Sequence, residues 1–308
     1  MNAGRHCPLH YRYPVAGLAD AMPESASTLH VIGGLYGNEA ALDAVDALAA
    51  AEPGPVTQCF NGDFNWFNRE PESFARVNRR VLQADALRGN VETEIAAAED
   101  HADCGCAYPE WVDQGVVDRS NHIIRVLRES AKTQTVMTRQ LHDLPMYRCY
   151  RVAGKRVLAL HGDPESLAGW GLCQEYIDSS EQQQVVAHWH RQSRADVFAC
   201  THTCLPFLYR RAGAVVINNG AAGMPNFSGS TFGILTRIAD SPCAVPSLYG
   251  LEQDGLYIDA LAIRYDQHRW LKAFVSQWPE TSPAHTSYFA RMLGQVDYTE
   301  GQALRDFS

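Results

Sequence analysis

The sequence predicts an α/β fold with two mixed β-sheets and helices on their outer faces. Between residues 29 and 88, short β-branched runs alternate with helical patterns, which is typical of right-handed crossovers and a largely parallel sheet. After residue 147 the pattern changes to a hairpin followed by further strands. The number of expected strands fits two sheets better than one.

The first half of the chain is expected to alternate strand and helix. After the apolar run 29–32, Leu42, Val45 and Leu48 repeat at three-residue spacing, which indicates a helix that begins after Asn38. Pro53 and Gly54 end this helix, and the proline at position 71 begins the next one. We therefore expect strands at 29–32, 56–60 and 86–88 and helices at 39–52 and 71–83.

The second half contains more strands and ends in helices. Segment 113–133 keeps its apolar residues on one side, as an amphipathic helix does. The turn 153–155 separates two strand-like runs and predicts a hairpin. The expected helices are 92–100, 113–133, 181–194, 267–278 and 285–296. The expected strands are 147–152, 156–160, 197–199, 215–217, 232–238 and 257–264.

Two parts of the chain differ in their patterning. Residues 1–28 contain Pro, Gly and Ser without a clear period, so we expect an irregular N-terminal lead-in. Residues 29–308 are expected to form a single domain with a C-terminal helical extension. No internal repeat or low-complexity tract divides this domain.

Composition excludes several classes of function. The 308 residues are 46% hydrophobic, which is enough for a large core, and the net charge of -9 disfavours broad nucleic-acid binding. Nine scattered cysteines do not resemble a small disulfide scaffold and indicate a reducing compartment with mostly buried thiols. No uninterrupted run of about 18 apolar residues occurs, so we expect a cytoplasmic protein that does not span a membrane. The sequence leaves homo-oligomerisation open.

Several expected strands stop at a polar side chain. The apolar runs are followed by Asp63, Asn90, His161 and His202. In α/β sheets ligands bind at the carboxyl ends of the strands, so residues far apart in sequence become neighbours there. A carboxylate, an amide oxygen and two imidazoles form a ligand set that suits Mn, Fe, Co or Zn. We therefore expect a metal site at this edge.

The ordered motifs resemble those of the calcineurin-like metallophosphoesterase superfamily. The match covers residues 29–225 and consists of 34–38 (GLYGN), 62–63 (GD), 89–92 (GNVE), His161 and 201–204 (THTC). The resemblance implies a four-layer αββα sandwich that holds two metal ions. It also implies hydrolysis of phosphoric esters.

The chain departs from the family pattern at four positions. The Asp and His of the first motif are Gly34 and Tyr36, the His after Gly-Asn is Val91, and the last His is Cys204. By resemblance, the second ion keeps its full ligand set of Asp63, Asn90, His161 and His202. The first ion keeps only the shared Asp63 and a possible thiolate from Cys204. We therefore expect one firmly bound divalent ion.

Other residues have both a functional and a structural interpretation. Tyr36 either contacts a metal or phosphate or fills the emptied space, and Asn38 either donates to a phosphate or caps the following helix. Cys104 and Cys106 are either additional thiolate ligands or a redox pair, and Cys204 is either a ligand or a buried small side chain. Asp163 and Glu165 follow His161 in an expected loop, and their carboxylates either assist catalysis or face solvent.

The function expected from these residues is metal-dependent hydrolysis of a small phosphomonoester or phosphodiester. Tyr36 and Asn38 are the candidates for contact with the phosphate. The loss of the family residues at three motifs leaves a second hypothesis, an inactive or regulatory binding protein on the same scaffold. A third hypothesis is a metalloenzyme whose site is rebuilt with Cys104, Cys106 and Cys204.

Overall fold

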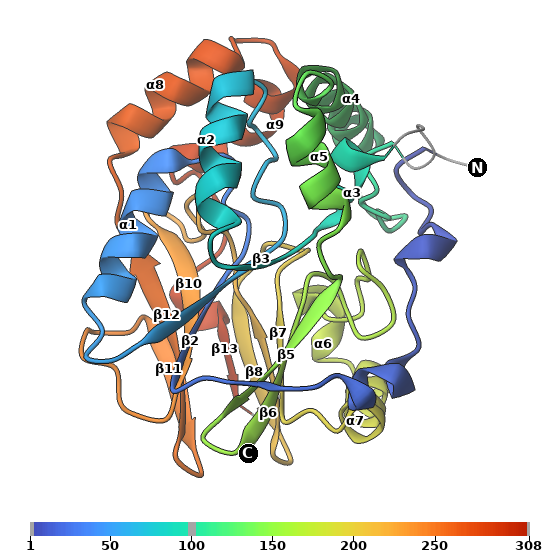
Figure 1. The fold of residues 1–308 in the computed structure, drawn as a ribbon. Coiled ribbons are helices and arrows are strands. Elements are labelled where there is room, and N and C mark those ends of the chain that lie inside the picture. The colour runs from blue at the N-terminus through green and yellow to red at the C-terminus, as the bar shows by residue number, and fades with distance from the viewer. Residues whose placement is uncertain (1–2, 98–102, 307–308) are drawn as a thin grey trace.

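The computed structural model describes residues 3–97 and 103–306 of the chain. In these residues two β-sheets pack face to face and helices cover both outer faces (Figure 1). The seven-stranded sheet has the order β1-β5-β6-β7-β9-β8-β13, and the six-stranded sheet has the order β11-β12-β10-β2-β3-β4. The expected αββα sandwich of two mixed sheets is confirmed.

The six-stranded sheet begins with the predicted alternation of strand and helix. Strands β2, β3 and β4 are parallel, and α1 and α2 connect them. Strands β10, β12 and β11 then continue the sheet in antiparallel pairs. The bounds are β2 Thr28–Ile32, α1 Glu39–Ala50, β3 Val56–Asn61, α2 Pro71–Val81, β4 Asp85–Leu87, β10 Gly233–Ala239, β11 Tyr249–Gln253 and β12 Leu256–Ile263.

The seven-stranded sheet is built around the predicted hairpin. Strands β5 and β6 are antiparallel and joined at the turn 153–154, whereas β6, β7 and β9 are parallel neighbours. Strand β8 pairs with β9 in antiparallel fashion, and β13 and β1 form the two edges. The bounds are β1 Glu24–Ser25, β5 Tyr147–Val152, β6 Lys155–Leu160, β7 Val197–Cys200, β8 Phe207–Arg211, β9 Ala214–Asn218 and β13 Leu304–Asp306.

The core follows the period-two alternation of the strands. In β6, Val157 and Ala159 pack between the two sheets, whereas Leu158 and Leu160 pack against the outer helices. Strand β2 behaves in the same way, because Val31 lies between the sheets and Ile32 belongs to the cluster beneath α1 and α2. The outer helix of the seven-stranded sheet is α7, Ser180–Ser193, together with the short α6, Gln174–Ile177.

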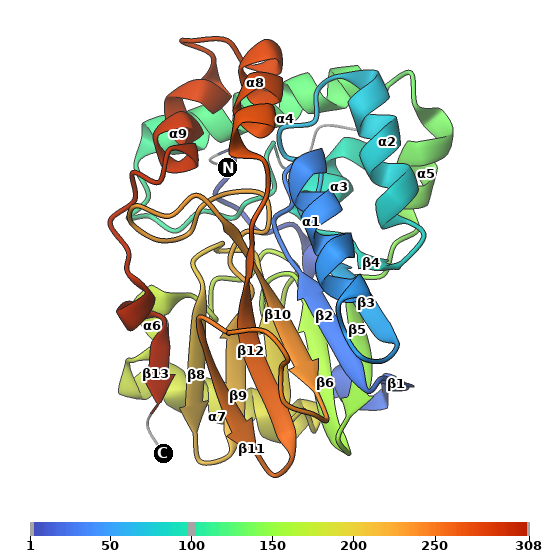
Figure 2. The ribbon, with the colours of Figure 1, turned by 90° about the vertical axis from the view of Figure 1, so that its left-hand side faces the viewer.

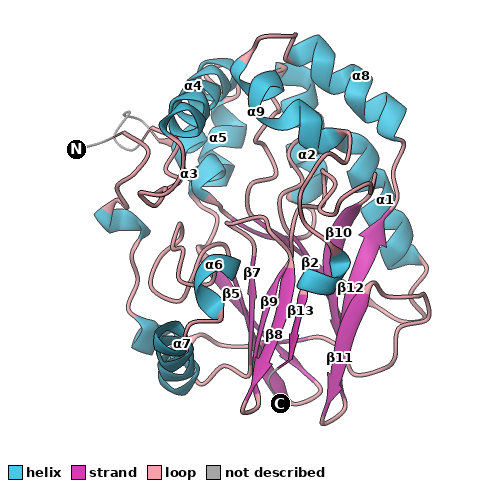
Figure 3. Ribbon diagram, turned by 180° about the vertical axis from the view of Figure 1, so that it is seen from behind, coloured by secondary structure: helices cyan, strands magenta, loops and turns pink. Residues whose placement is uncertain are grey.

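The remaining α-helices gather beyond the carboxyl ends of the parallel strands (Figures 2 and 3). They are α3 Asn90–Ala96, α4 Gln114–Ala131, α5 Thr135–His142, α8 Gln267–Gln277 and α9 Pro283–Met292. The C-terminal helices thus reach the end of the sheets where the polar residues were expected. The helix expected at 92–100 ends at Ala96, and residues 98–100 lie outside the described part.

Some elements carry too weak a periodic signal to be predicted. Strands β8, β11 and β13 and helices α5 and α6 were not expected. Strand β11 is mostly half-exposed, and α6 is only four residues long. The residues before β2 also hold regular structure, namely the 3-10 helices Leu9–Tyr11 and Val15–Asp20 and strand β1, and the side chains of Tyr11 and Leu18 are fully buried.

None of the helices in the described residues is both long and apolar enough to cross a lipid bilayer.

Candidate metal centre

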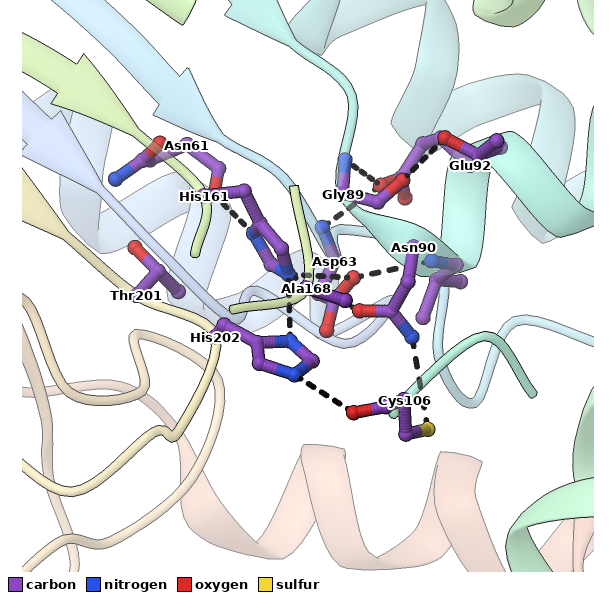
Figure 4. A network of polar contacts seen from close by, with 12 residues as sticks. Asn61, Asp63, Gly89, Asn90, Glu92, Cys106, His161, Ala168, Thr201 and His202 are labelled. Carbon is purple, nitrogen blue, oxygen red and sulfur yellow. Dashed lines mark hydrogen bonds and ion pairs between the residues drawn. The ribbon is translucent and has the colours of Figure 1, made fainter. Parts of the chain in front are cut away.

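Four side chains from four different strand ends meet at the upper edge of the sandwich. Asp63 follows β3, Asn90 follows β4, His161 follows β6 and His202 follows β7. Figure 4 shows them pointing toward one another. The sequence therefore placed these residues at the correct ends of the correct strands. We call Asp63, Asn90, His161 and His202 the acceptor cluster, because the side-chain atoms that meet there can each accept a hydrogen bond.

His161 is the centre of this cluster. Its Nδ1 lies 2.9 Å from the carbonyl oxygen of Asn61, so Nδ1 donates and Nε2 keeps its lone pair. That Nε2 lies 3.1 Å from Oδ1 of Asn90, 3.3 Å from Nδ1 of His202 and 3.4 Å from Oδ1 of Asp63. Three acceptor atoms therefore surround a fourth.

The partners of His202 and Asn90 set their orientation in the same way. Nε2 of His202 donates to the carbonyl oxygen of Cys106 at 3.0 Å, which leaves Nδ1 with a lone pair facing His161. The amide nitrogen of Asn90 donates to the carbonyl oxygen of Cys104 at 2.9 Å, which turns Oδ1 inward. With both imidazoles neutral, these assignments leave all four atoms that meet without a proton.

Such an arrangement needs a positive charge among the four atoms. The ligand atoms of Asp63, His161 and His202 lie within 4.8 Å of one another, which is compatible with a single metal ion between them. Acceptors that face one another in a buried place repel unless a cation or a proton lies between them. Carboxylate, amide oxygen and imidazole nitrogen are the ligands of divalent transition metals, so the side chains present fit such an ion.

The pKa values of the ionisable groups in the cluster are shifted by burial and by the neighbouring charges. Burial disfavours a charged imidazole, but the adjacent Asp63 carboxylate outweighs it and raises the pKa of His161. Burial would raise the pKa of Asp63, yet His161 and His202 lower it. Burial and the charge of His161 lower the pKa of His202 to about 4. Within the chain itself, a proton on His161 is thus the available cation.

The loop that carries Asp63 has little freedom to change. Asp63 has a positive φ of 55°, which is uncommon outside glycine and occurs often at functional sites. Gly62 before it has a φ of 79°, and a Cβ there would lie 2.5 Å from Nδ1 of His161 and 2.6 Å from the backbone nitrogen of Gly89. Only glycine therefore allows the loop to approach the imidazole so closely.

Glu92 in α3 fixes the same loop from behind. Its carboxylate accepts from the backbone N–H groups of Asp63 at 2.7 Å, Gly89 at 3.0 Å and Asn65 at 3.2 Å. Burial and the neighbouring Asp63 carboxylate raise the pKa of Glu92 to about 7. Glu92 thus holds together the two loops that present Asp63 and Asn90.

A cavity that is partly open to solvent adjoins the cluster. Five of its lining side chains are aromatic, and among the described residues that line it Arg291 is the only Lys or Arg. The lining residues are Tyr36, Asp63, Trp66, Asn90, Val91, Cys106, Tyr108, Trp170, His202, Thr203, Cys204, Tyr288 and Arg291. The cavity therefore combines apolar walls with a few polar groups, as small-molecule sites do.

Cys204 was expected among the metal ligands, and the structure does not bring its sulfur into the acceptor cluster. No cysteine of the described residues belongs to the group of ligand atoms around His161. Cys204 has a positive φ of 52°, its thiol forms a hydrogen bond with the hydroxyl of Tyr36, and both residues line the cavity. Burial raises the pKa of the Cys204 thiol to about 12, and burial also raises that of Tyr36. Both groups therefore remain protonated.

Asn38 lies outside the lining of the cavity, in contrast to the expected phosphate contact. Its side chain is fully buried, Oδ1 accepts from the backbone N–H of Ala41, and the amide nitrogen donates to the carbonyl oxygen of Gly223. The amide is thus used by the N-terminus of α1 and by the loop after β9. Tyr36, the other candidate for phosphate contact, does line the cavity.

The remaining candidates from the sequence have structural partners. Asp163 accepts three backbone N–H groups within its own loop, and Glu165 accepts from the indole of Trp189. Cys104 and Cys106 are buried, Cys106 lines the cavity, and their carbonyl oxygens orient Asn90 and His202. This loop therefore contributes two backbone carbonyl oxygens to the cluster, together with Sγ of Cys106, which accepts from the amide of Asn90 at 3.6 Å.

Two residues of the site were missed by the sequence reasoning. Glu92 stands at the third position of α3, and a Glu there after Gly-Asn is a signal of a helix N-terminus that could have identified it. Arg291 comes from α9, about ninety residues after His202, and no local pattern marks it. It reaches the cavity only through the packing of the C-terminal helices.

Comparison with known proteins shows the fold. No protein-family model and no curated protein matches the sequence. Among solved structures, a metallophosphoesterase from Sphaerobacter thermophilus is 17% identical, with a TM-score of 0.54, and the match covers 87% of this chain and 100% of that one. A hypothetical protein from Pyrococcus horikoshii OT3 is 13% identical, with a TM-score of 0.60, and the match covers 88% of this chain and 99% of that one. The fold implied by the resemblance in the sequence is thereby confirmed.

Proposed function

We propose that this chain is a metal-dependent hydrolase of small phosphomonoesters or phosphodiesters. The acceptor cluster would hold one divalent transition metal ion, Mn, Fe, Zn or Co, and the adjacent cavity would take the substrate. One observation carries the proposal: acceptor atoms of Asp63, Asn90 and His202 converge on Nε2 of His161 beside a cavity that contains a guanidinium. The metallophosphoesterase fold supports it.

A metal ion bound here would polarise a phosphoryl oxygen and acidify a coordinated water, which is worth several kcal/mol in the transition state. The protein's part is to keep the ligands in place. The carbonyl oxygens of Asn61 and Cys106 accept from the two imidazoles and so hold the ring nitrogens that face inward. Asn90 is held by Cys104 in the same manner.

The cavity offers neutral donors for the departing oxygen. Val91 occupies the position where the resemblance implies a histidine that assists the leaving group, so no imidazole is available there. The hydroxyl of Tyr36 stays protonated because burial raises its pKa, and it lines the cavity. We therefore propose Tyr36 as the group that donates a hydrogen bond to the substrate, and we expect turnover to be slow with poor leaving groups.

The test combines metal analysis with a substrate screen. The chain is purified, its metal content is measured, and aryl phosphates and phosphodiesters are offered with added Mn, Fe, Co or Zn. We expect one ion per chain and turnover that His202→Ala abolishes. The matched control is His190→Ala, which removes a buried histidine of α7 that lies outside the cavity.

Two results would contradict this proposal. One is the absence of turnover under every metal condition, which would favour a binding or regulatory role for the same site. The other is more than one ion per chain, with the additional ion lost in Cys204→Ser. That result would favour a site rebuilt with cysteine.

A further inference from the structure

Arg291 is held rigidly at the wall of the cavity. Its Nε donates to the carbonyl oxygen of Pro225 at 3.0 Å, and its Nη2 donates to the carbonyl oxygen of Cys204 at 3.0 Å and to Oδ1 of Asn226 at 3.4 Å. These bonds come from two loops and define the plane of the guanidinium. The side chain is therefore oriented before any ligand arrives.

One edge of this guanidinium is not used. Within the described residues, Nη1 of Arg291 has no hydrogen-bond acceptor, and no carboxylate lies within ion-pair distance of the group. A fixed positive charge with two free donors thus lines the same cavity as Asp63 and His202.

We propose that Arg291 binds an oxygen of a phosphate group through Nη1. A guanidinium presents its donors in a planar fork that matches phosphate oxygens, and charge-assisted hydrogen bonds are about twice as strong as neutral ones. Because the donor is already fixed, little conformational entropy is lost when the anion binds. The identity of the anion as a substrate's phosphoryl group rests on the proposed function, whereas anion binding at Arg291 rests on its own geometry.

The C-terminal helical extension acquires a role from this assignment. Helix α9 supplies both Arg291 and Tyr288 to the cavity, while the acceptor cluster comes from the sheets. The metal centre and the phosphate-binding group therefore belong to different parts of the chain. We assign Arg291 as a substrate-binding residue rather than a residue of the metal centre.

The experiment measures binding of inorganic phosphate by calorimetry to wild type, Arg291→Gln, Arg291→Lys and Arg269→Gln. Each protein is tested after chelation and again after loading with Mn. We expect Arg291→Gln to weaken phosphate binding by about ten- to a hundredfold without changing the number of Mn ions bound. Arg269→Gln is the matched control. Arg269 lies in α8 and pairs with Asp43 of α1, and its replacement changes the net charge by the same amount.

Arg291→Lys separates the ligand contact from the structural one. A lysine ammonium can still donate to the carbonyl oxygens of Pro225 and Cys204, but it has no second nitrogen that could take the place of Nη1 and donate to a phosphate. We expect a folded protein with weakened phosphate binding and a raised KM. Thermal unfolding with and without phosphate provides a second readout, since phosphate should raise the Tm of wild type more than that of either Arg291 variant.

A readout without variants completes the test. In wild type, inorganic phosphate should slow the modification of Arg291 by phenylglyoxal, followed by mass spectrometry of the peptide, and should not protect Arg269. Unchanged phosphate affinity in a folded Arg291 variant, equal loss in Arg269→Gln, or absence of protection would each overturn the inference. Phosphate binding through Arg291 without turnover would support the assignment of Arg291 and would contradict the proposed hydrolase function instead.

Discussion

The acceptor cluster and a second buried polar cluster bring opposite kinds of groups together. In the second, which we call the charge cluster, Glu52 accepts from Arg237 Nε at 2.6 Å and Nη2 at 3.1 Å, and His30 Nε2 lies 3.3 Å from the same carboxylate. A buried anion thus meets a buried cation of the chain. In the acceptor cluster the carboxylate of Asp63 accepts one neutral donor, the backbone N–H of Val91 at 3.2 Å, and faces the acceptor atoms of His161, Asn90 and His202 without an Arg or Lys of the described residues to balance its charge.

The histidines of the two clusters show the difference. At His30 burial prevails over the nearby Glu52 and lowers the pKa, because Arg237 already balances that carboxylate. At His161 the pKa is raised, because no permanent cation stands near Asp63 in the cluster. Buried polar groups serve stability where their charges are matched within the chain. Where they are left unmatched beside a cavity, they indicate a ligand.

The largest expected effect is that of Asp63→Asn. The negative charge that attracts a cation is lost, while Oδ1 of the asparagine can keep the hydrogen bond from the backbone N–H of Val91. We expect loss of metal binding and a fall in turnover of about a thousandfold or more, since Lewis-acid assistance is worth several kcal/mol. Retention of metal in this variant would contradict the assignment.

Glu52→Gln should have the reverse result. The variant leaves the buried Arg237 with only the longer contact of its Nη1 to Asp259 at 3.6 Å, and breaking a buried ion pair typically costs about 3 kcal/mol or more. Denaturant unfolding should show this loss, whereas the number of metal ions bound should stay the same as in wild type. If the charge cluster variant lost metal as well, the two clusters would not be independent.

Glu92→Gln tests the support of the metal centre. One oxygen of the carboxylate becomes an NH₂ group that faces backbone N–H donors of Asp63, Asn65 and Gly89. We expect a loss of about 1–3 kcal/mol in stability and a ten- to hundredfold weaker metal affinity. Calorimetric metal titration together with denaturant unfolding would measure both. A variant that lost stability but bound metal normally would limit Glu92 to a folding role.

A pH titration of the metal-free chain by NMR should distinguish His161 from His30. The raised pKa of His161 means that its contribution to stability is fully present below the unfolded value of about 6.5 and disappears as the pH rises through the higher folded value. The lowered pKa of His30 means that stability is lost as the pH falls below about 6.5. Added metal should abolish the titration of His161 and leave that of His30 in place.

The smallest expected effect is that of Asn38→Ala. The variant loses the cap of α1, which is worth about 1 kcal/mol, and leaves the cavity unchanged. Denaturant unfolding should show this decrease, with metal and phosphate binding as in wild type. A tenfold loss of phosphate affinity would return Asn38 to the site.

The sequence predicted the members of the acceptor cluster because each carries a local signal. A buried strand that stops at Asp, Asn or His needs no tertiary information, and parallel strands place such residues at one edge. The roles of Cys204 and Asn38 could not be read in this way. Cys204 adopts a left-handed backbone conformation and its sulfur is not among the ligand atoms around His161, and the use of Asn38 depends on the loop around Gly223 that packs on it.

The rest of the site depends on contacts between distant segments. Arg291 enters the cavity because α9 packs against the loops after β7 and β9, which nothing in its own helix indicates. The carbonyl of Cys106 orients His202 only after the loop 103–113 has folded onto the sheet edge. The strand β13 at the C-terminus was missed because three residues at a sheet edge give no period.

The most direct test of the account is anomalous diffraction from a crystal of the chain grown with Mn or Zn. We expect a single anomalous peak within coordination distance of Asp63 Oδ1, Asn90 Oδ1, His161 Nε2 and His202 Nδ1. Absence of a peak at that point in metal-loaded crystals, or a peak bound by the cysteine sulfurs instead, would contradict it.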